Sequence, residues 1–228
     1  MKPQKKHRLP ALFTVTVCLV ILALLAHFQV TPLQVVDHWL AYPLQTKVTP
    51  TRTFMFRLIS VIAQPTFALI YAILLAGGLW YFHQRAAAVW SGTTFLAGAV
   101  ISWLLKHLVA RPRPTTHVLT SETGYSFPSG HVFTAVMIIS LLLYLFTKSL
   151  PHLWQRAGCL LLAGIWLGLV LCARIYLGAH YPSDTVAGLL LGYLWLRAAL
   201  WSHHQFNPWL QTHLEKAPTN MRHARKPK

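Results

Sequence analysis

The chain has 228 residues, of which 55% are hydrophobic and 11% charged, with 20 Lys and Arg against four Asp and Glu. A soluble globular domain carries about 25% charged residues, so this composition excludes an ordinary soluble domain, and its apolar content excludes a disordered chain. The formal charge of +16 could indicate a nucleic-acid partner, but the basic residues lie at the ends of apolar runs rather than on one face. We therefore expect a single-domain (1–228) polytopic membrane protein with basic loops and no nucleic-acid partner.

Six apolar runs are candidates for membrane-spanning helices, because a helix needs about 20 residues, and at least about 17, to cross the hydrocarbon core. They cover residues 10–30, 58–82, 86–105, 132–147, 157–173 and 185–201. The first run follows basic residues, as in a signal peptide, but its apolar core is longer and no small-residue cleavage pattern follows. The fourth run is the shortest and reaches the lower bound if His131 is already helical. The sequence thus predicts an all-α integral membrane protein with a bundle of six helices.

Two further segments are more polar than the spans. Residues 31–57 contain apolar side chains at near-helical spacing, which predicts a short helix in the membrane interface with Trp39 and Tyr42 at the headgroup level. From residue 202 onward the chain is polar and basic. We expect this tail, 202–228, to be solvated or to rest on anionic headgroups.

Six spans place both termini on one side of the membrane, and the basic residues predict which side. The side of the termini carries 13 of the 20 Lys and Arg, and the other side carries seven. Because positive loops stay in the cytoplasm, we expect both termini to be cytoplasmic in the plasma membrane. Four of the outer seven lie at span ends beside His-containing loops, which indicates a reason other than topology: Lys106, Arg111, Arg113 and Arg174.

Three segments on the predicted outer side combine ionisable residues with helix starts. Residues 106–114, KHLVARPRP, close the third span, and residues 126–131, SFPSGH, open the fourth. Residues 174–184, RIYLGAHYPSD, link the fifth span to the sixth. Because all three lie on the same side, they can converge above the helix ends.

These segments contain the groups that bind phosphate. Lys106, Arg113 and Arg174 offer fixed positive donors, and guanidinium groups match phosphate oxygens. Ser129 and Gly130 lie where the fourth helix begins, so free backbone N–H groups and the helix dipole add to an anion cradle. The expected ligand is a phosphate group.

Two histidines and one acid could react with that phosphate. His131 and His180 titrate near neutral pH, so one can act as nucleophile while the other acts as general acid and then base. Asp184 lies four residues beyond His180, across a helix start, close enough to accept a proton from the second imidazole nitrogen. That contact would leave the first nitrogen free to attack.

The shortage of acids disfavours metal-assisted hydrolysis. Asp37, Glu122, Asp184 and Glu215 are too few to build the oxygen clusters that hold Mg²⁺ or Ca²⁺, and the three cysteines read as packing residues in apolar runs. We therefore expect no metal and no cofactor. Glu122 is interpreted as a loop residue near the site. Arg111 fits equally a lipid-headgroup contact and a supporting position behind the site.

The three segments resemble the signature motifs of the type 2 phosphatidic acid phosphatase superfamily: Lys with Arg-Pro seven residues on, Pro-Ser-Gly-His, and Ser-Arg followed by His and Asp. Their order, spacing and placement at the ends of spans three to six agree with that family. One position departs, since Ala173 replaces the Ser before Arg174. It removes a hydroxyl but no charged group, so we expect activity to survive. The resemblance implies a six-helix bundle with its site at the extracytoplasmic ends of helices 3 to 6, and metal-free catalysis through a phosphohistidine.

The resemblance also implies a role for each motif position. His180 resembles the nucleophile, Asp184 its orienting partner, and His131 the acid that protonates the leaving oxygen and later activates water. The positions that resemble the phosphate-binding set are Lys106, Arg113, Ser129, Gly130 and Arg174.

We therefore predict a membrane-embedded lipid phosphatase that removes a terminal phosphate from a lipid mono- or diphosphate, with lipid phosphates and membrane lipids as its partners. Bacterial members of the family suggest phosphatidylglycerophosphate, phosphatidic acid or undecaprenyl diphosphate, and an outward-facing site slightly favours the last. The alternative is a non-catalytic anionic-lipid binding or transport protein that uses the same basic pocket. It would need the Lys and Arg residues but not the His pair with Asp.

Overall fold

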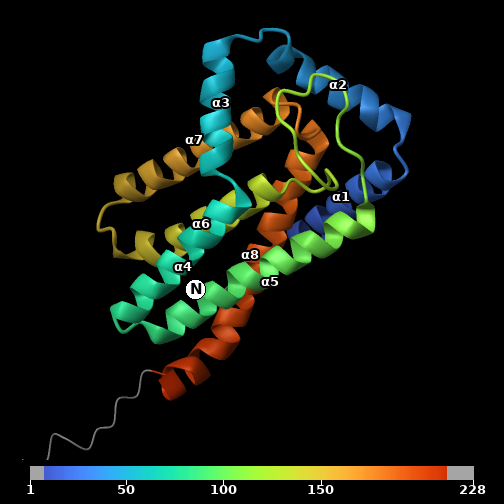
Figure 1. Ribbon diagram of the computed structural model, residues 1–228. Helices are drawn as coiled ribbons and strands as arrows, with labels where there is room; N and C mark the ends of the chain where they lie inside the picture. Colours follow the sequence, from blue (N-terminus) through green and yellow to red (C-terminus); the bar gives the residue numbers. More distant parts are fainter. Residues whose placement is uncertain (1–7, 215–228) are drawn as a thin grey trace, which may run out of the picture.

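The computed structural model describes residues 8–214, which contain helices and no strand (Figure 1). Residues 1–7 and 215–228, with much of the predicted basic termini, lie outside the described residues. The helices in chain order are α1 (Arg8–His27), α2 (Thr31–Gln45), α3 (Pro50–Ile62), α4 (Pro65–Tyr81), α5 (Arg85–Val109), α6 (Gly130–Phe146), the short 3₁₀ helix η1 (Thr147–Ser149), α7 (Leu153–Tyr176) and α8 (Pro182–Leu214).

Four of these helices are long and apolar enough to cross a membrane, namely α1, α5, α7 and α8. Helices α3 and α4 meet the same criterion only as a pair, and they are bent by 44° at a short break. The single continuous helix predicted over 58–82 is therefore wrong. Gln64 is extended and Pro65 begins α4, because the proline ring disfavours helical backbone in the residue before it.

The number of spans among the described helices is thus four, or five if the bent pair counts as one. Helix α6 has 17 residues and is apolar, but it is shorter than the other candidates. Its assignment as a span, and with it the bundle of six spans, stays a prediction.

Both polar segments contain helix among the residues that the structure describes. Helix α2 exposes Trp39 and Tyr42 while its other face buries Asp37, so an acid points inward from a helix whose aromatic side chains face outward. The predicted tail begins as helix, since α8 continues past residue 201 to Leu214.

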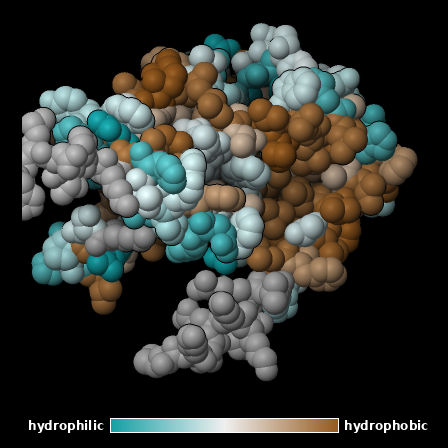
Figure 2. All heavy atoms as spheres, turned by 90° about the horizontal axis from the view of Figure 1, so that it is seen from below, coloured by the Kyte–Doolittle hydropathy of each residue, from teal (hydrophilic) through white to brown (hydrophobic). Residues whose placement is uncertain are grey.

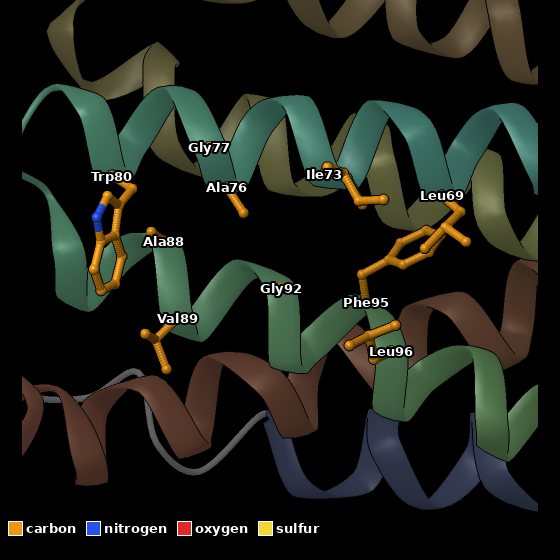
Figure 3. A pocket seen from close by; sticks show the side chains of 11 residues that line it. Leu69, Ile73, Ala76, Gly77, Trp80, Ala88, Val89, Gly92, Phe95 and Leu96 are labelled. Atoms are coloured by element: carbon orange, nitrogen blue, oxygen red, sulfur yellow. The ribbon is translucent and has the colours of Figure 1, made fainter.

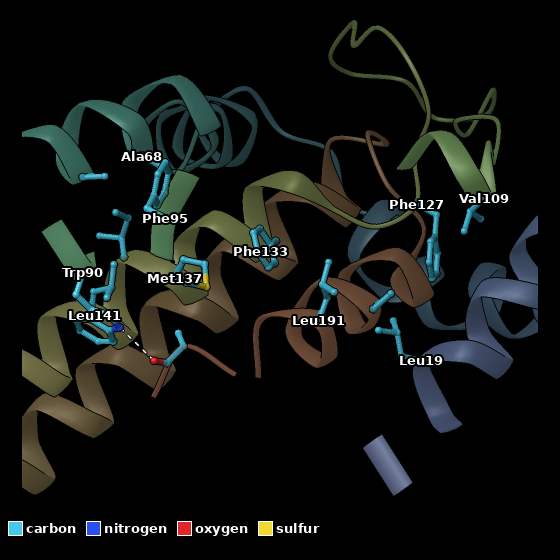
Figure 4. Packing of buried hydrophobic residues seen from close by; sticks show 14 of the residues in the cluster. Leu19, Ala68, Trp90, Phe95, Val109, Phe127, Phe133, Met137, Leu141 and Leu191 are labelled. Atoms are coloured by element: carbon cyan, nitrogen blue, oxygen red, sulfur yellow. Dashed lines mark hydrogen bonds between the residues drawn. The ribbon is translucent and has the colours of Figure 1, made fainter. Parts of the chain in front are cut away.

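Helix α6 is the centre of the bundle and contacts α4, α5, α7 and α8. Its buried face includes Phe133 and Met137, which pack with Phe95 of α5 and Leu191 of α8 (Figure 4). Gly192 lets α8 approach closely, because a Cβ there would lie 2.6 Å from Cγ1 of Val136 on α6. The ends of α6 and α8 are thereby held in fixed relation, which matters because both carry motif residues.

The lateral surface of the bundle is apolar. Leu160, Leu161 and Leu162 of α7 and Ile73 and Leu74 of α4 are each more than 60% exposed. Figure 2 shows one face on which hydrophobic residues form a broad area, with hydrophilic residues gathered toward its margins. A soluble monomer does not expose apolar surface on this scale, whereas a lipid bilayer covers it.

A groove of about 430 Å³ runs between α4 and α5, lined by side chains such as Leu69, Ile73, Trp80 and Phe95 (Figure 3). None of its lining residues is charged. This groove therefore offers space for apolar groups and no ionisable side chain that could bind or transfer a charged group.

Candidate active site

The three motif segments meet at one end of the bundle, where α5 and α7 end and α6 and α8 begin (Figure 1). The Ser126 amide donates to the Arg111 carbonyl at 2.9 Å, and the Ser126 hydroxyl donates to the Pro112 carbonyl at 3.0 Å. The Ser129 amide donates to the Asp184 carbonyl at 3.0 Å. These backbone contacts join the first segment to the second and the second to the third.

The link between α7 and α8 positions His180. Gly178 has a φ of +68°, and a Cβ there would lie 2.0 Å from the His117 carbonyl oxygen, so only glycine fits this turn. Pro182 then begins α8, and Asp184 occupies the first turn, where the helix dipole favours an acid. The turn therefore delivers a buried imidazole and a buried carboxylate side by side.

His180 lies between a carboxylate and a guanidinium group. Its Nδ1 is 3.6 Å from Oδ2 of Asp184, longer than a hydrogen bond, and this buried nitrogen has no hydrogen-bond partner. Its Nε2 is 3.5 Å from Nη1 of Arg113. The imidazole thus points one nitrogen at the carboxylate and the other at the cationic groups.

Burial, followed by the positive charges of Arg174, Arg113 and Lys106, lowers the pKa of His180 well below its ordinary 6.5. The imidazole is therefore neutral at neutral pH. A neutral imidazole has the free lone pair that a nucleophile requires.

Arg113 and Lys106 are held by backbone carbonyl oxygens. Arg113 donates to the carbonyls of Ala179 at 2.8 Å, Gly124 at 3.0 Å and Thr123 at 3.0 Å. Lys106 donates to the carbonyl of Tyr125 at 2.6 Å. Burial lowers the pKa of the Arg113 guanidinium, an effect that Glu122 and Asp184 oppose. Since carbonyls are neutral, these cations keep their charge available for an anion.

Arg174 is fully buried and has an acidic partner. It donates to Oε1 of Glu122 at 2.5 Å and to the hydroxyl of Ser60, while its Nε has no hydrogen-bond partner. The second oxygen of Glu122 is 4.0 Å from Nη2 of Arg113. Glu122 is thus a loop residue at the site, as expected, and it lies between two of the predicted phosphate-binding guanidinium groups. Ser60, on α3, had not been singled out.

The start of α6 contributes the remaining predicted residues. Ser129 precedes Gly130, the first residue of the helix, and its buried hydroxyl makes no hydrogen bond. His131 is buried and lies within electrostatic range of Arg174, His180, Arg113 and Lys106. All eight predicted site residues therefore gather at this end of the bundle.

No sequence motif indicates Asp37, and the motif pattern allows two positions for Arg111. Arg111 is 3% exposed and donates to Oδ2 of Asp37 and to Oδ1 of Asp184, both at 2.7 Å. A lipid-headgroup contact for Arg111 is excluded by this burial, and the position behind the site is the one observed. Asp37 could have been suspected as one of only four acids, placed in a helix of otherwise apolar and polar neutral residues.

The three acids among the described residues are all bonded to arginine, Asp37 and Asp184 to Arg111 and Glu122 to Arg174. Within residues 8–214, no group of three His, Cys, Asp or Glu side chains is arranged to hold a metal ion.

Comparison with known families identifies the superfamily of the chain. A family model described as the PAP2 superfamily matches residues 86–208, a range that includes every predicted site residue. The chain belongs to the PAP2 superfamily. This membership agrees with the resemblance that the three motifs carry.

Several curated proteins are similar to this PAP2 chain. Phosphatidylglycerophosphatase B of Bacillus subtilis is 28% identical over 130 residues, which are 57% of this chain and 64% of that protein. Undecaprenyl-diphosphatase BcrC of the same organism is 30% identical over 139 residues, 56% of this chain and 66% of that protein. Lipid A 1-phosphatase of Rhizobium etli is 34% identical over 110 residues, covering 44% and 43%. The matched region thus spans less than two thirds of these relatives.

Two solved structures share the fold. The crystal structure of a transmembrane PAP2 type phosphatidylglycerolphosphate phosphatase from Bacillus subtilis aligns with a TM-score of 0.76 at 23% identity, over 85% of this chain and 96% of that one. Aquifex aeolicus LpxE aligns with a TM-score of 0.56 at 22% identity, over 71% and 93%. Together with the apolar helices, this likeness identifies an integral membrane protein with the PAP2 fold.

Proposed function

We propose that this PAP2 protein is a metal-independent lipid phosphatase that hydrolyses the terminal phosphate of a lipid mono- or diphosphate. The observation that carries the proposal is the setting of His180. Its neutral imidazole faces Asp184 with one nitrogen and Arg113 with the other. A binding protein would need the cations but not a neutral imidazole held against a buried carboxylate.

In the proposed mechanism, Nε2 of His180 attacks phosphorus and forms a P–N bond as the P–O bond to the lipid breaks. Lys106, Arg113 and Arg174 bind the phosphate oxygens, on which negative charge is spread in the transition state. His131, in its protonated form, gives its proton to the leaving oxygen. The negative charge of a bound phosphate favours that protonated form.

The second step regenerates the enzyme. His131, now neutral, takes a proton from water, which attacks phosphorus and breaks the P–N bond. Inorganic phosphate leaves, and His180 returns to its neutral form. Asp184 faces Nδ1 throughout and stabilises the positive charge that the imidazole carries as phosphohistidine.

The proposed substrate class is supported by the names of the relatives. Their names specify phosphatidylglycerophosphate, undecaprenyl diphosphate and lipid A phosphate, all of them lipids with a terminal phosphate. For this chain we propose phosphatidylglycerophosphate, phosphatidic acid or undecaprenyl diphosphate, with a slight preference for the last if the site faces outward.

The proposed topology has six spans, with both termini in the cytoplasm and the site at the extracytoplasmic face of the plasma membrane. It is supported by the excess of basic residues on the side of the termini. A C-terminal tag should be inaccessible to a reagent added to intact cells. A tag that is labelled from outside would overturn this topology.

The experiment that tests the function measures phosphate release by purified protein from a panel of lipid mono- and diphosphates, with and without EDTA. We expect release from at least one lipid, unchanged in EDTA, and a fall of at least about 10³-fold in His180→Ala, with lipid binding retained. Release that persists in His180→Ala contradicts the mechanism. Lipid binding without any release by the wild type would favour the anionic-lipid binding or transport alternative.

A further inference from the structure

A buried charge network lies directly behind Asp184. Arg111 contacts Asp37 of α2 with one terminal nitrogen and Asp184 of α8 with the other, each at 2.7 Å, and all three side chains are at most 3% exposed. Ser183 joins the same network, because its amide donates to Oδ1 and its hydroxyl to Oδ2 of Asp37. The Arg111 guanidinium also lies over the ring of Tyr181, 4.0 Å from its centroid. Helix α2 is therefore tied to the start of α8 at the residues that flank His180.

We propose that Asp37 and Arg111 are positioning residues. They keep the Asp184 carboxylate ionised and oriented toward His180, and they make α2 part of the active site. This inference rests on the proposed phosphatase function. Their side chains hydrogen-bond to each other, to Ser183 and to Asp184, and none of these is in the predicted phosphate-binding set, so both act through Asp184.

The orientation follows from how the oxygens of Asp184 are used. Oδ1 accepts from Arg111, whereas Oδ2 accepts from the Tyr181 amide at 2.9 Å and faces Nδ1 of His180. With both oxygens held, the carboxylate cannot rotate away from the imidazole. Without Arg111, a fully buried carboxylate would lack a compensating charge and would tend to become protonated.

The charge of the network explains why a second acid is present. One arginine paired only with Asp184 would cancel the negative charge that His180 needs when it becomes phosphohistidine. Because Arg111 is shared with Asp37, the three side chains together carry a charge of −1 rather than zero. Coulomb interactions are strong in this buried environment, and the network meets His180 through Oδ2 of Asp184, 3.6 Å from Nδ1. Burial alone would lower the pKa of Arg111, but Asp184 and Asp37 raise it above its ordinary value, so the arginine stays charged.

The test uses Asp37→Asn in the full-length protein in detergent or proteoliposomes. Asparagine keeps the shape and one acceptor for Ser183 but removes the surplus charge, leaving Arg111 and Asp184 as a neutral pair. We expect kcat to fall by about 10- to 100-fold with KM within about twofold of the wild type, the size typical of partners that orient an active-site group. His38→Gln, on the next and exposed position of α2, is the matched control and should leave both constants unchanged.

A double-mutant cycle separates positioning from a general loss of structure. If Asp37 acts through Asp184, Asp37→Asn has no further effect on kcat in an Asp184→Asn background. If Asp37→Asn does not fold, Ser183→Ala takes its place, since it removes the hydroxyl that bridges Asp37 and Arg111 beside their direct ion pair and keeps every charge. Ser183→Ala should lower kcat by less than the fall expected for Asp37→Asn, and KM should again be unchanged.

An unchanged kcat in Asp37→Asn, or an effect that adds fully to that of Asp184→Asn, overturns the inference while leaving the phosphatase function intact. A wild type that releases no phosphate from any lipid in the panel overturns the proposed function, and this inference with it.

Discussion

Arg111 and Arg113 are separated by a single proline, yet their surroundings are opposite. Arg111 is buried against two carboxylates, whereas Arg113 donates to three backbone carbonyls and lies beside His180. The guanidinium pKa values differ in the same way. Burial lowers the pKa of Arg113, whereas Asp184 and Asp37 outweigh burial and raise the pKa of Arg111. Arg111, which is shared between two buried carboxylates, is committed to the scaffold. A cation held by neutral carbonyls still attracts an anion.

The largest expected effect is on stability, and it separates the two arginines. Arg111→Gln leaves two buried carboxylates without a counter-charge, which typically costs about 3–5 kcal/mol. Arg113→Gln should cost about 1 kcal/mol, because two of its three carbonyl partners, those of Thr123 and Gly124, lie on an exposed loop and can be hydrated. Denaturant unfolding of both variants in detergent measures the difference. Equal stability of the two variants would show that the buried network does not carry this energy.

The next largest effect is on catalysis, where the substitution of Arg113 is expected to cost more than that of Arg111. Arg113→Gln removes a donor aimed at the phosphate, so kcat/KM should fall by about 10²- to 10³-fold while the protein remains folded. The control is Arg57→Gln, because Arg57 is exposed and also donates to a carbonyl of the 110–129 loop, that of Leu119. A loss of the same size in both variants would assign the effect to the loop rather than to phosphate binding.

The pH dependence of kcat/KM should sharpen the comparison further. Activity falls as the pH drops through the pKa of the free enzyme's nucleophile, and burial and neighbouring cations hold the pKa of His180 well below 6.5. Removing one of those cations in Arg113→Gln raises this pKa, so the acidic limb should move to higher pH. Arg113→Lys retains the charge and should leave the limb in place. The wild type, Arg113→Gln and Arg113→Lys should be measured on the same substrate. The ionisation of the substrate phosphate then contributes equally to all three pH profiles.

The smallest effect concerns Glu122, the acid that approaches both Arg174 and Arg113. Its carboxylate repels a phosphate bound at the same guanidinium groups. Glu122→Gln should therefore lower the inhibition constant of inorganic phosphate several-fold, by removing about 1 kcal/mol of repulsion in a partly exposed site. Weaker inhibition would instead indicate that Glu122 mainly holds Arg174 in position.

The sequence predicted the local features well where a short-range rule applies. Ser129 and Gly130 mark the start of α6, and the helix start expected between His180 and Asp184 is the start of α8 at Pro182. It failed at Gln64, because hydropathy measures apolar content and does not register that Pro65 interrupts the helix. It also ended the last helix at residue 201, because polarity shows where lipid contact ends and not where helical hydrogen bonding ends.

The amino-acid sequence by itself determined that this is a helical membrane protein and that its eight motif residues gather at one end of the bundle, because apolar runs set the helices and alternating helices bring the motif ends to one side. Only the tertiary structure decided how the charges are divided. Asp37 is 74 residues from Arg111, and no local pattern joins them. Whether a guanidinium is enclosed by two carboxylates, as at Arg111, or held by carbonyls beside His180, as at Arg113, depends on burial and distance across helices, and these exist only once the bundle is packed.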